Sequence, residues 1–371
     1  MATRILAVNP ADGGNEAVRE AGRALADGAI VVFPTETVYG VGANAADLRA
    51  LETLSRLKSR APDKPFTLHL ARPAEASRYA GPLSTLARRL IRKCWPGPLT
   101  LVLPDGRDAA APSPVALPQT VYWQGFVGLR CPDHAVGRAV LEAAGVPVVA
   151  SSANLAGRPA PRTAGEALAA LDGHAALVID SGPTPYARPS TVVRIRPDDA
   201  YEILREGAIT ARRLERLART RILIVCTGNL CRSPMAMGLA RKIAAERLGC
   251  RPEELEDRGV EIRSAGTGAV EAAPASANAI LAAGDLGVDL RNHTSRPMTV
   301  DALLAADYIW VMTRGHLASV VRLAPEVADR TALLDPRGEE IGDPMGGDLA
   351  TYRQCARRLE AALVERLAEI T

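Results

Sequence analysis

The stretch ILIVCTGNLCRSPMA, residues 222–236, contains the strongest fold signal in the chain. Its first four residues are apolar and mostly β-branched, which predicts a short buried strand. Ser233 and Pro234 predict a helix start, with serine as N-cap and proline at the first helical position. Apolar residues then keep helical spacing as far as Gly249, where we expect the helix to end. Residues 226–232 are thus predicted to form a tight loop at a helix N-terminus, where backbone N–H groups and the helix dipole favour an anion.

The composition is that of an ordinary globular protein. The chain has 371 residues, 47% of them hydrophobic and 23% charged, with a net charge of +3. This balance argues against a dedicated nucleic-acid binder. No apolar stretch approaches the ~20 residues of a membrane span, and the first residues lack a signal-peptide core, so we expect no membrane contact. Six cysteines, two of them in one loop, indicate reduced thiols and a cytoplasmic location.

Lysine is rare in this chain, with four lysines against 41 arginines. Two of the four, Lys58 and Lys64, lie in the segment KSRAPDKPF, residues 58–66. Because most basic residues of this chain are arginine, the presence of a lysine in this segment favours a functional interpretation, in which a compact cation is needed.

The first half of the chain alternates helices and strands, which predicts an α/β fold. We expect a helix at 16–29, a strand at 30–33, a second helix at 46–57 and a strand at 67–70. Polar motifs follow several strands, where α/β folds keep their ligand sites. Taken singly, these motifs leave other interpretations open: Lys58 and Arg60 as a solvated helix end, residues 151–154 as a helix cap, and His69 as a core histidine.

The motifs gain meaning from their order: PTETVYG (34–40), K-x-R (58–60), S-x-N (152–154) and STVV (190–193). Together they resemble the YrdC-like threonylcarbamoyl-adenylate synthase family, over roughly residues 8–210. The resemblance implies a twisted mixed α/β sheet with a concave cleft. It also implies condensation of L-threonine, bicarbonate and ATP into threonylcarbamoyl-adenylate with release of pyrophosphate. The product would serve t6A modification of tRNA, so tRNA or the t6A transferase complex is an expected partner.

The same resemblance assigns two groups of residues. Those expected to contact threonine or the carbamoyl group are Thr35, His69, Arg130 and Ser152. Those expected to bind ATP are Lys58, Arg60, Lys64, Asn154 and Arg205. Fixed cations suit this chemistry because departing pyrophosphate develops negative charge, and we expect Mg²⁺ to accompany ATP without a protein-ligated metal site.

The segment TARRLERLARTR, residues 210–221, is helix-prone and rich in arginine. We interpret it as a linker helix whose arginines form a solvated face rather than an RNA contact. It separates an expected synthase domain at residues 1–212 from a second domain at residues 216–371.

The second half resembles low-molecular-weight protein-tyrosine phosphatases, over about residues 220–370. The motifs that carry the resemblance are CTGNLCRSP (226–234), SAGTGA (264–269), HTSRPMT (293–299), DYIWVMTRGH (307–316) and IGDPMGGDLATYRQ (341–354). The resemblance implies a small parallel sheet wrapped by helices, a phosphoprotein substrate and no cofactor.

The expected chemistry follows from the groups in these motifs. Cys226 is the predicted nucleophile, because the helix N-terminus, the inward N–H groups and Arg232 favour a thiolate. Arg232 would bind two phosphate oxygens, Asn229 would hold the loop's shape, and the Ser233 hydroxyl would stabilise the thiolate. The leaving oxygen needs a general acid, for which we choose Asp343 over a second Asp-Pro at Asp335.

Two positions in the loop bear on regulation and specificity. Cys231 is either a resolving thiol that protects Cys226 from over-oxidation or a packing residue. Leu230 stands where family members that act on phosphoarginine carry threonine and those that act on phosphotyrosine carry an aliphatic residue. The sequence therefore predicts that aryl phosphates are preferred to phosphoarginine.

We therefore predict a bifunctional cytoplasmic enzyme, a threonylcarbamoyl-AMP synthase (a nucleotidyltransferase) fused to a protein-tyrosine phosphatase that works through a cysteinyl-phosphate. One alternative is a non-catalytic double-stranded RNA-binding module joined to a phosphatase acting on phosphoarginine or another substrate. An arsenate reductase in the second half is disfavoured, since Cys250 and Cys355 do not form a close pair in sequence.

Overall fold

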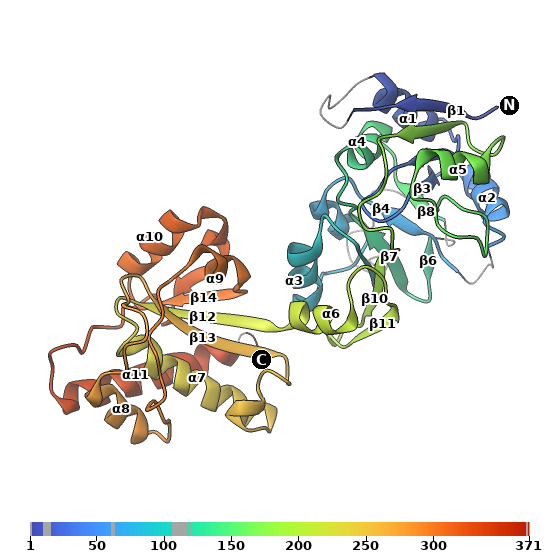
Figure 1. The fold of residues 1–371 in the computed structure, drawn as a ribbon. Helices are drawn as coiled ribbons and strands as arrows, with labels where there is room; N and C mark the ends of the chain where they lie inside the picture. Colours follow the sequence, from blue (N-terminus) through green and yellow to red (C-terminus); the bar gives the residue numbers. More distant parts are fainter. Residues whose placement is uncertain are drawn as a thin grey trace. The chain divides into compact units, whose positions relative to one another are not determined.

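A computed structural model describes residues 2–9, 16–60, 64–105, 117–118, 121–368 and 370. The chain divides into two compact units, Met1–Leu217 and Ala218–Thr371, called here the first and second unit (Figure 1). No helix among the described residues is long and apolar enough to cross a membrane.

The first unit alternates strands and helices along the chain. In order, these are β1 (Arg4–Ala7), α1 (Glu16–Ala26), β2 (Val31–Phe33), β3 (Gly40–Asn44), α2 (Leu48–Leu57), β4 (Thr67–His69), η2 (Pro73–Arg78), α3 (Thr85–Cys94), β5 (Leu99–Pro104), β6 (Tyr122–Trp123), β7 (Phe126–Arg130), α4 (Ala135–Ala144), β8 (Val148–Ser152), α5 (Ala164–Leu171), β9 (Leu177–Asp180), β10 (Thr191–Ile195), β11 (Tyr201–Arg205) and α6 (Ala211–Ala218).

These strands form one mixed sheet, in the order β1-β9-β2-β3-β8-β4-β7-β5-β10-β11, with β6 paired to β7. Strand β3 runs antiparallel to β2 and β8, whereas β4 is parallel to β7. The predicted α/β class with a mixed sheet is confirmed.

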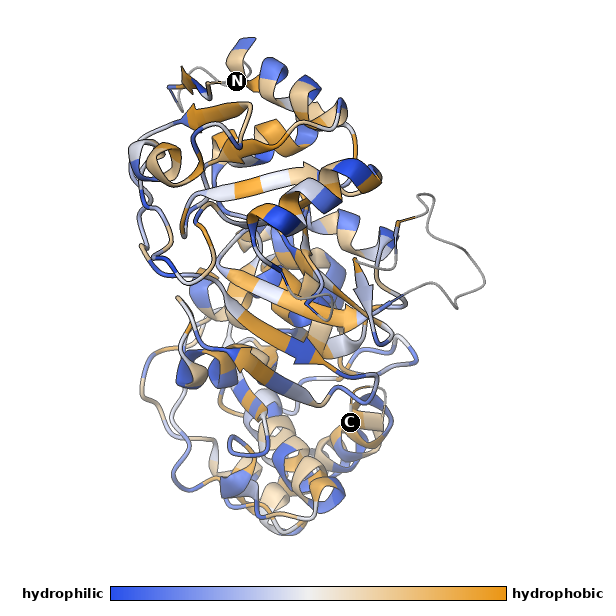
Figure 2. Cartoon of the chain, turned by 90° about the vertical axis from the view of Figure 1, so that its right-hand side faces the viewer, coloured by the Kyte–Doolittle hydropathy of each residue, from blue (hydrophilic) through white to orange (hydrophobic). Residues whose placement is uncertain are grey.

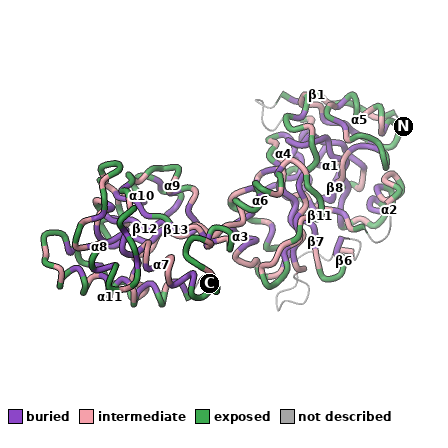
Figure 3. Tube along the Cα trace, turned by 60° about the horizontal axis from the view of Figure 1, so that its bottom comes forward, coloured by how far each residue is buried: buried purple, intermediate pink, exposed green. Residues whose placement is uncertain are grey.

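The core of the first unit follows from helical spacing. Val18, Ala21 and Leu25 recur on one face of α1 and pack with Val140 of α4 and Phe33 of β2. Figure 3 shows the central strands largely buried, while the helices carry many exposed residues. The helix predicted at 46–57 begins at Leu48, because the Asp47 carboxylate accepts hydrogen bonds from the N–H groups of the first turn.

The second unit is a four-stranded parallel sheet in the order β13-β12-β14-β15. Its elements are β12 (Thr220–Cys226), α7 (Arg232–Leu248), η3 (Pro252–Glu254), β13 (Val260–Gly266), α8 (Ala277–Gly284), α9 (Val300–Ala305), β14 (Tyr308–Val311), α10 (Arg314–Leu323), η4 (Pro325–Arg330), β15 (Thr331–Leu333) and α11 (Leu349–Ala368).

The predicted strand at 222–225 is buried on both faces. Ile222 and Ile224 pack with α7, α8 and α11, while Leu223 and Val225 pack with α9 and α10. Successive strand residues point to opposite sides, so an unbroken apolar run requires helices on both faces. The hydropathy colouring in Figure 2 shows apolar strands beside helices banded with polar residues. The predicted small parallel sheet wrapped by helices is confirmed.

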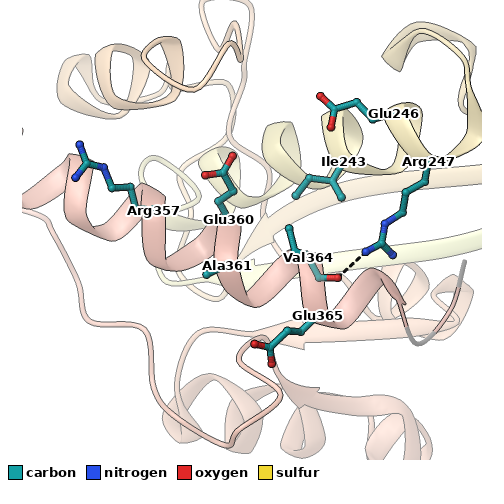
Figure 4. Close-up of a pocket in the computed structure, with 8 residues that line it drawn as sticks. All are labelled: Ile243, Glu246, Arg247, Arg357, Glu360, Ala361, Val364 and Glu365. Carbon is teal, nitrogen blue, oxygen red and sulfur yellow. Dashed lines mark hydrogen bonds between the residues drawn. The ribbon is translucent and has the colours of Figure 1, made fainter.

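Helices α7 and α11 pack along each other and present an open groove, drawn in Figure 4. Ile243 and Val364 lie on facing sides of this groove, and Arg247 Nη2 donates a 2.7 Å hydrogen bond to the Val364 carbonyl. The remaining lining mixes arginines and glutamates of both helices.

Two local predictions differ from the structure. Helix α7 begins at Arg232 with Cys231 as N-cap, so Ser233 is not the cap. The Ser233 hydroxyl is instead engaged by Cys226 and Asn229, and Pro234 is tolerated because the first turn needs no N–H donor. The segment 210–221 is only partly helical: α6 ends at Ala218, β12 begins at Thr220, and Leu214 is fully buried.

Candidate active sites

Residues 226–232 form a closed loop between the C-terminal end of β12 and the N-terminus of α7. Cys226 is 2% exposed, and its Sγ accepts a 3.2 Å hydrogen bond from the Asn229 N–H. The Ser233 Oγ lies 3.0 Å from the same sulfur. The Asn229 N–H, the Ser233 hydroxyl and a helix N-terminus therefore surround the Cys226 sulfur, an arrangement that favours a thiolate.

Asn229 is fully buried and holds the loop through both ends of its side chain. Its Nδ2 donates to Ser233 Oγ at 2.8 Å and to Ser264 Oγ at 2.9 Å. Its Oδ1 accepts from the Arg296 N–H at 2.9 Å. Asn229 has a φ of 54°, a left-handed conformation that asparagine tolerates better than most residues. The loop's shape thus depends on this side chain.

Gly266, at the end of β13, lets the loop approach the sheet. A Cβ at this position would lie 2.5 Å from the Thr227 carbonyl oxygen and 2.9 Å from the Asn229 nitrogen. Only glycine fits this contact without displacing the loop backbone.

Arg232 and Asp343 form an ion pair between Arg232 Nη2 and Asp343 Oδ2. Arg232 is 4% exposed and also donates to the Ile341 carbonyl at 3.2 Å, while the Asp343 side chain is 45% exposed. The other Asp-Pro aspartate is engaged elsewhere: Asp335 accepts from the Arg337 N–H and pairs with Arg358. Of the two aspartates, Asp343 is therefore the one that contacts Arg232.

Cys231 points to a different set of groups from Cys226. Its sulfur lies 3.3 Å from both Ser276 Oγ and Tyr352 OH. Leu230 is half-buried and packs at the edge of the core of the second unit. These contacts are compatible with both interpretations of Cys231, as a resolving thiol or a packing residue, and with the predicted effect of Leu230 on substrate preference.

Two histidines beside the loop were not among the predicted site residues, although both lie in the quoted motifs. His293 Nε2 lies 2.9 Å from the Asn229 carbonyl oxygen. His316 lies between Thr227 Oγ1 and Thr313 Oγ1, at 2.9 Å from each. Burial lowers the pKa of both histidines. Their contacts reach the loop from segments 64 and 89 positions away in the chain, which no local sequence pattern reveals.

In the first unit, Lys58 joins the K-x-R and S-x-N motifs directly. Its Nζ donates to the Ser152 carbonyl at 2.8 Å, to Asn154 Oδ1 at 3.0 Å and to the Asn154 carbonyl. Ser152 Oγ also donates to Asn154 Oδ1. Burial, and then the neighbouring Arg60 charge, lower the pKa of Lys58 to about 8. The solvated-helix-end interpretation of Lys58 does not fit these contacts.

Arg60 is held beside this cluster by backbone and ring contacts. Its guanidinium donates to the carbonyls of Lys64 and Pro65 and lies 4.2 Å from the centre of the Phe66 ring. The Lys64 side chain is exposed. Ala61, one of the residues of KSRAPDKPF, lies outside the described residues.

Arg130 is buried in an ion pair with Glu36, which was not predicted. Arg130 Nη2 lies 2.9 Å from Glu36 Oε1 and donates to Thr37 Oγ1 at 2.6 Å. Thr35 Oγ1 donates to the Val38 carbonyl and accepts from the Thr37 and Val38 N–H groups. The only sequence sign of Glu36 is a carboxylate within the hydroxyl-rich PTETVYG loop.

His69 and Arg205 lie within the electrostatic reach of Arg130. His69 and Arg130 are register partners on β4 and β7, and burial together with Arg130 lowers the pKa of His69 to about 3. Arg205 Nη2 donates to the Ser190 carbonyl at 2.8 Å, and burial followed by Arg130 lowers its pKa. A neutral core histidine remains consistent with these contacts of His69.

Among the described residues, no group of three or more His, Cys, Asp or Glu side chains is placed to hold a metal ion. The first unit thus brings Lys58, Ser152 and Asn154 into one cluster and Thr35, Glu36 and Arg130 into another. The second unit brings all five predicted catalytic residues around one loop, which are Cys226, Asn229, Arg232, Ser233 and Asp343.

Two family models match the two units of the chain separately. A family model for Sua5, YciO and YrdC proteins, described as "Telomere recombination", matches residues 23–207. A model described as "Low molecular weight phosphotyrosine protein phosphatase" matches residues 221–371.

Curated relatives match the first unit. A threonylcarbamoyl-AMP synthase of Bacillus subtilis is 38% identical over 53% of this chain and 55% of its own length. A putative threonylcarbamoyl-AMP synthase of Methanocaldococcus jannaschii is 33% identical over 51% of this chain and 85% of its own length. A solved structure of a Pyrococcus abyssi Sua5 variant aligns with a TM-score of 0.51 at 25% identity, covering 71% of this chain and 91% of that one. The chain spans only about half the length of some curated relatives it matches, including the B. subtilis protein.

Proposed function

The chain belongs to the threonylcarbamoyl-AMP synthase family and carries a low molecular weight phosphatase domain at its C-terminal side, and from this premise we propose a bifunctional enzyme. The first unit would condense L-threonine, bicarbonate and ATP into threonylcarbamoyl-AMP and pyrophosphate, for use in t6A modification of tRNA. The second unit would hydrolyse phosphoprotein monoesters.

For the first unit, the observation that carries the proposal is the cluster of Lys58 with Ser152 and Asn154. All three N–H donors of Lys58 are engaged by chain oxygens, so its first effect is to hold the S-x-N turn and place a positive charge there. Arg60 and Arg205 likewise donate hydrogen bonds to backbone carbonyls, and neither is ion-paired with a carboxylate among the residues that the structure describes. Such fixed cations would stabilise the negative charge that develops on departing pyrophosphate.

The buried pair of Arg130 and Glu36 supports a threonine site. Among the described residues, the pair leaves Arg130 Nε and Glu36 Oε2 buried without hydrogen-bond partners. An amino acid carries a carboxylate that accepts and an ammonium that donates, so it supplies the partners that these two atoms lack. This complementarity supports threonine binding by Arg130.

Mg²⁺ would reach this site with the nucleotide. The described residues provide no carboxylate cluster for it, and Mg²⁺ commonly binds through substrate phosphates and water. The ion would neutralise charge on the phosphates of ATP, while Lys58, Arg60 and Arg205 act as described above.

For the second unit, the carrying observation is that the Asn229 N–H and the Ser233 hydroxyl converge on the Cys226 sulfur. We infer that the Cys226 thiolate attacks phosphorus, the bond to the leaving oxygen breaks, and Asp343 donates its proton to that oxygen. Water then attacks the cysteinyl-phosphate, Asp343 takes the water's proton, and the thiolate leaves. Before this, the substrate phosphate would take the place of Asp343 on Arg232, which frees the aspartate to act as the acid.

One experiment tests both halves on the same sample. Pyrophosphate release from ATP should require threonine and bicarbonate, and Lys58→Ala or Arg60→Ala should abolish it without loss of p-nitrophenyl phosphate hydrolysis. Cys226→Ser should do the reverse. Threonine-independent ATP consumption, or unchanged turnover in these variants, would contradict the assignments.

The alternative of a non-catalytic RNA-binding first unit is not favoured, since the matching relatives of that unit are synthases. Salt-sensitive RNA binding without threonine-dependent pyrophosphate release would support the RNA-binding alternative instead.

A further inference from the structure

The second unit contains a polar cavity of about 400 Å³ that the proposed chemistry does not use. It lies between α7, the end of β13 and the segment 289–296. None of the loop residues 226–232 lines it, and neither does Asp343, so it is distinct from the phosphatase site. Its volume falls within the ~300–1,000 Å³ range of small-molecule sites.

Three arginines line this cavity, Arg241, Arg263 and Arg296. Arg241 is half-buried, yet its guanidinium donates only to the neutral Ile262 carbonyl, at 2.7 and 3.1 Å. Among the described residues no carboxylate lies within 4 Å of Arg241 or Arg296, whereas Arg263 pairs with Glu261. Burial, together with the nearby charges of Arg263 and Arg296, lowers the pKa of Arg241, and Glu256 and Glu261 oppose this only from beyond ion-pair distance. An anion in the cavity would therefore stabilise the Arg241 charge.

The two carboxylates that line the cavity are not ion-paired with Arg241 or Arg296. Glu256 is 3.0 Å from Arg219, and Asp289 is 2.7 Å from Arg291. Each of them is therefore already paired with an arginine that is not part of the lining. Within the described part of the chain, the Arg241 and Arg296 guanidiniums therefore have no ion-pair partner and are available to a ligand.

The cavity borders the phosphate loop through Asn229. His293 and Ser264 line the cavity and contact the Asn229 carbonyl and amide, respectively. The Arg296 backbone N–H donates to Asn229 Oδ1. A ligand held by the Arg296 guanidinium would therefore immobilise the segment that fixes Asn229, whose N–H is directed at Cys226.

We propose that this cavity binds a polyphosphate anion and thereby steadies the phosphate loop. Guanidinium forks match phosphate oxygens in pairs, and a cavity of this size accommodates more than one phosphate group. The choice of pyrophosphate as the first ligand to test rests on the proposed function of the first unit, which would release it. ATP shares the chemistry and is the second source to test.

Met237 lines the cavity, so the NMR signal of its methyl group reports binding in the cavity rather than in the first unit. The full chain, labelled with [¹³C-methyl]methionine and saturated with orthovanadate at Cys226, is titrated with pyrophosphate and followed by NMR. The Met237 resonance, assigned with Met237→Leu, should shift and saturate. Orthophosphate should act only at higher concentration, and a shift at lower concentration with ATP than with pyrophosphate would identify a nucleotide as the ligand.

The double variant Arg241→Gln/Arg296→Gln should need about tenfold or more pyrophosphate for the same shift, because it loses charge-assisted hydrogen bonds. Arg322→Gln, an exposed arginine on α10, is the matched control and should titrate as the unmutated chain. The single variant Arg296→Gln changes only an exposed side chain, so it tests the site even if the double variant does not fold. If the Met237 resonance does not shift, or if the arginine variants titrate as the unmutated chain does, the cavity holds an adventitious ion only. Either result would overturn the proposal.

The coupling is tested by repeating the titration without vanadate. Since coupling between two sites is reciprocal, vanadate in the loop should tighten pyrophosphate binding at Met237 by about fivefold or more. Equal dissociation constants would overturn the coupling to the loop. A saturating Met237 shift in a chain that releases no pyrophosphate would refute the proposed synthase activity and leave this site standing.

Discussion

Lys58 makes the proposed synthase activity dependent on pH in a way that one substitution can remove. Burial and the Arg60 charge lower the pKa of Lys58 to about 8. Below that pH the ammonium is charged and donates three hydrogen bonds to Ser152 and Asn154; above it the charge is lost. We therefore expect kcat/KM for ATP to fall as the pH rises through 8.

The size of the effect follows from the pKa. With a pKa of about 8, Lys58 is charged in about 90% of molecules at pH 7 and about 10% at pH 9, so kcat/KM should fall about tenfold between them. The profile of kcat/KM for ATP reports the enzyme form to which ATP binds, in which Lys58 is not yet in contact with the nucleotide.

The assay is pyrophosphate release with threonine and bicarbonate saturating and ATP varied from pH 6.5 to about 9.5. Lys58→Arg keeps a charge at every pH in this range, so its profile should be flat above pH 8, whatever its absolute activity. Lys93→Arg makes the same exchange on α3 and should keep the fall. A flat profile in the unmutated chain, or the same fall in Lys58→Arg, would refute the assignment of the titration to Lys58.

Three further predictions concern the second unit. Leu230→Thr should narrow or reverse the preference for phosphotyrosine over phosphoarginine peptides, by about 10- to 200-fold for one apolar contact; faster phosphoarginine hydrolysis by the unmutated chain would contradict this. Peroxide inactivation should be reversed by dithiothreitol, and Cys231→Ser should make it irreversible; equal recovery in both would make Cys231 a packing residue. Asp343→Asn should lower kcat/KM, which reports the step that expels the leaving group, by about 10²- to 10⁴-fold for alkyl phosphates and less for p-nitrophenyl phosphate, whose leaving group needs no proton; an equal loss of kcat/KM for both would exclude Asp343 as the acid.

Much of the fold could be predicted from the sequence, because short apolar runs and helical periodicity are local signals. The run at 222–225 predicts a buried strand, and the structure places helices on both of its faces. The end of α7 at Gly249 was predicted correctly as well, since glycine adopts the left-handed conformation found there. Its start was not, because Ser233 serves the loop rather than the helix cap.

The sequence by itself determined which chemical groups each unit possesses: a cysteine and an arginine six positions apart in one loop, and lysine and arginine in one short segment. Only the tertiary structure decided which groups meet. Lys58 and Asn154, Glu36 and Arg130, and Arg232 and Asp343 are 94 to 111 positions apart in the chain, yet each pair is in hydrogen-bond contact. Sheet register and strand order set these contacts, and both arise from packing across the whole unit, which no local pattern of residues encodes.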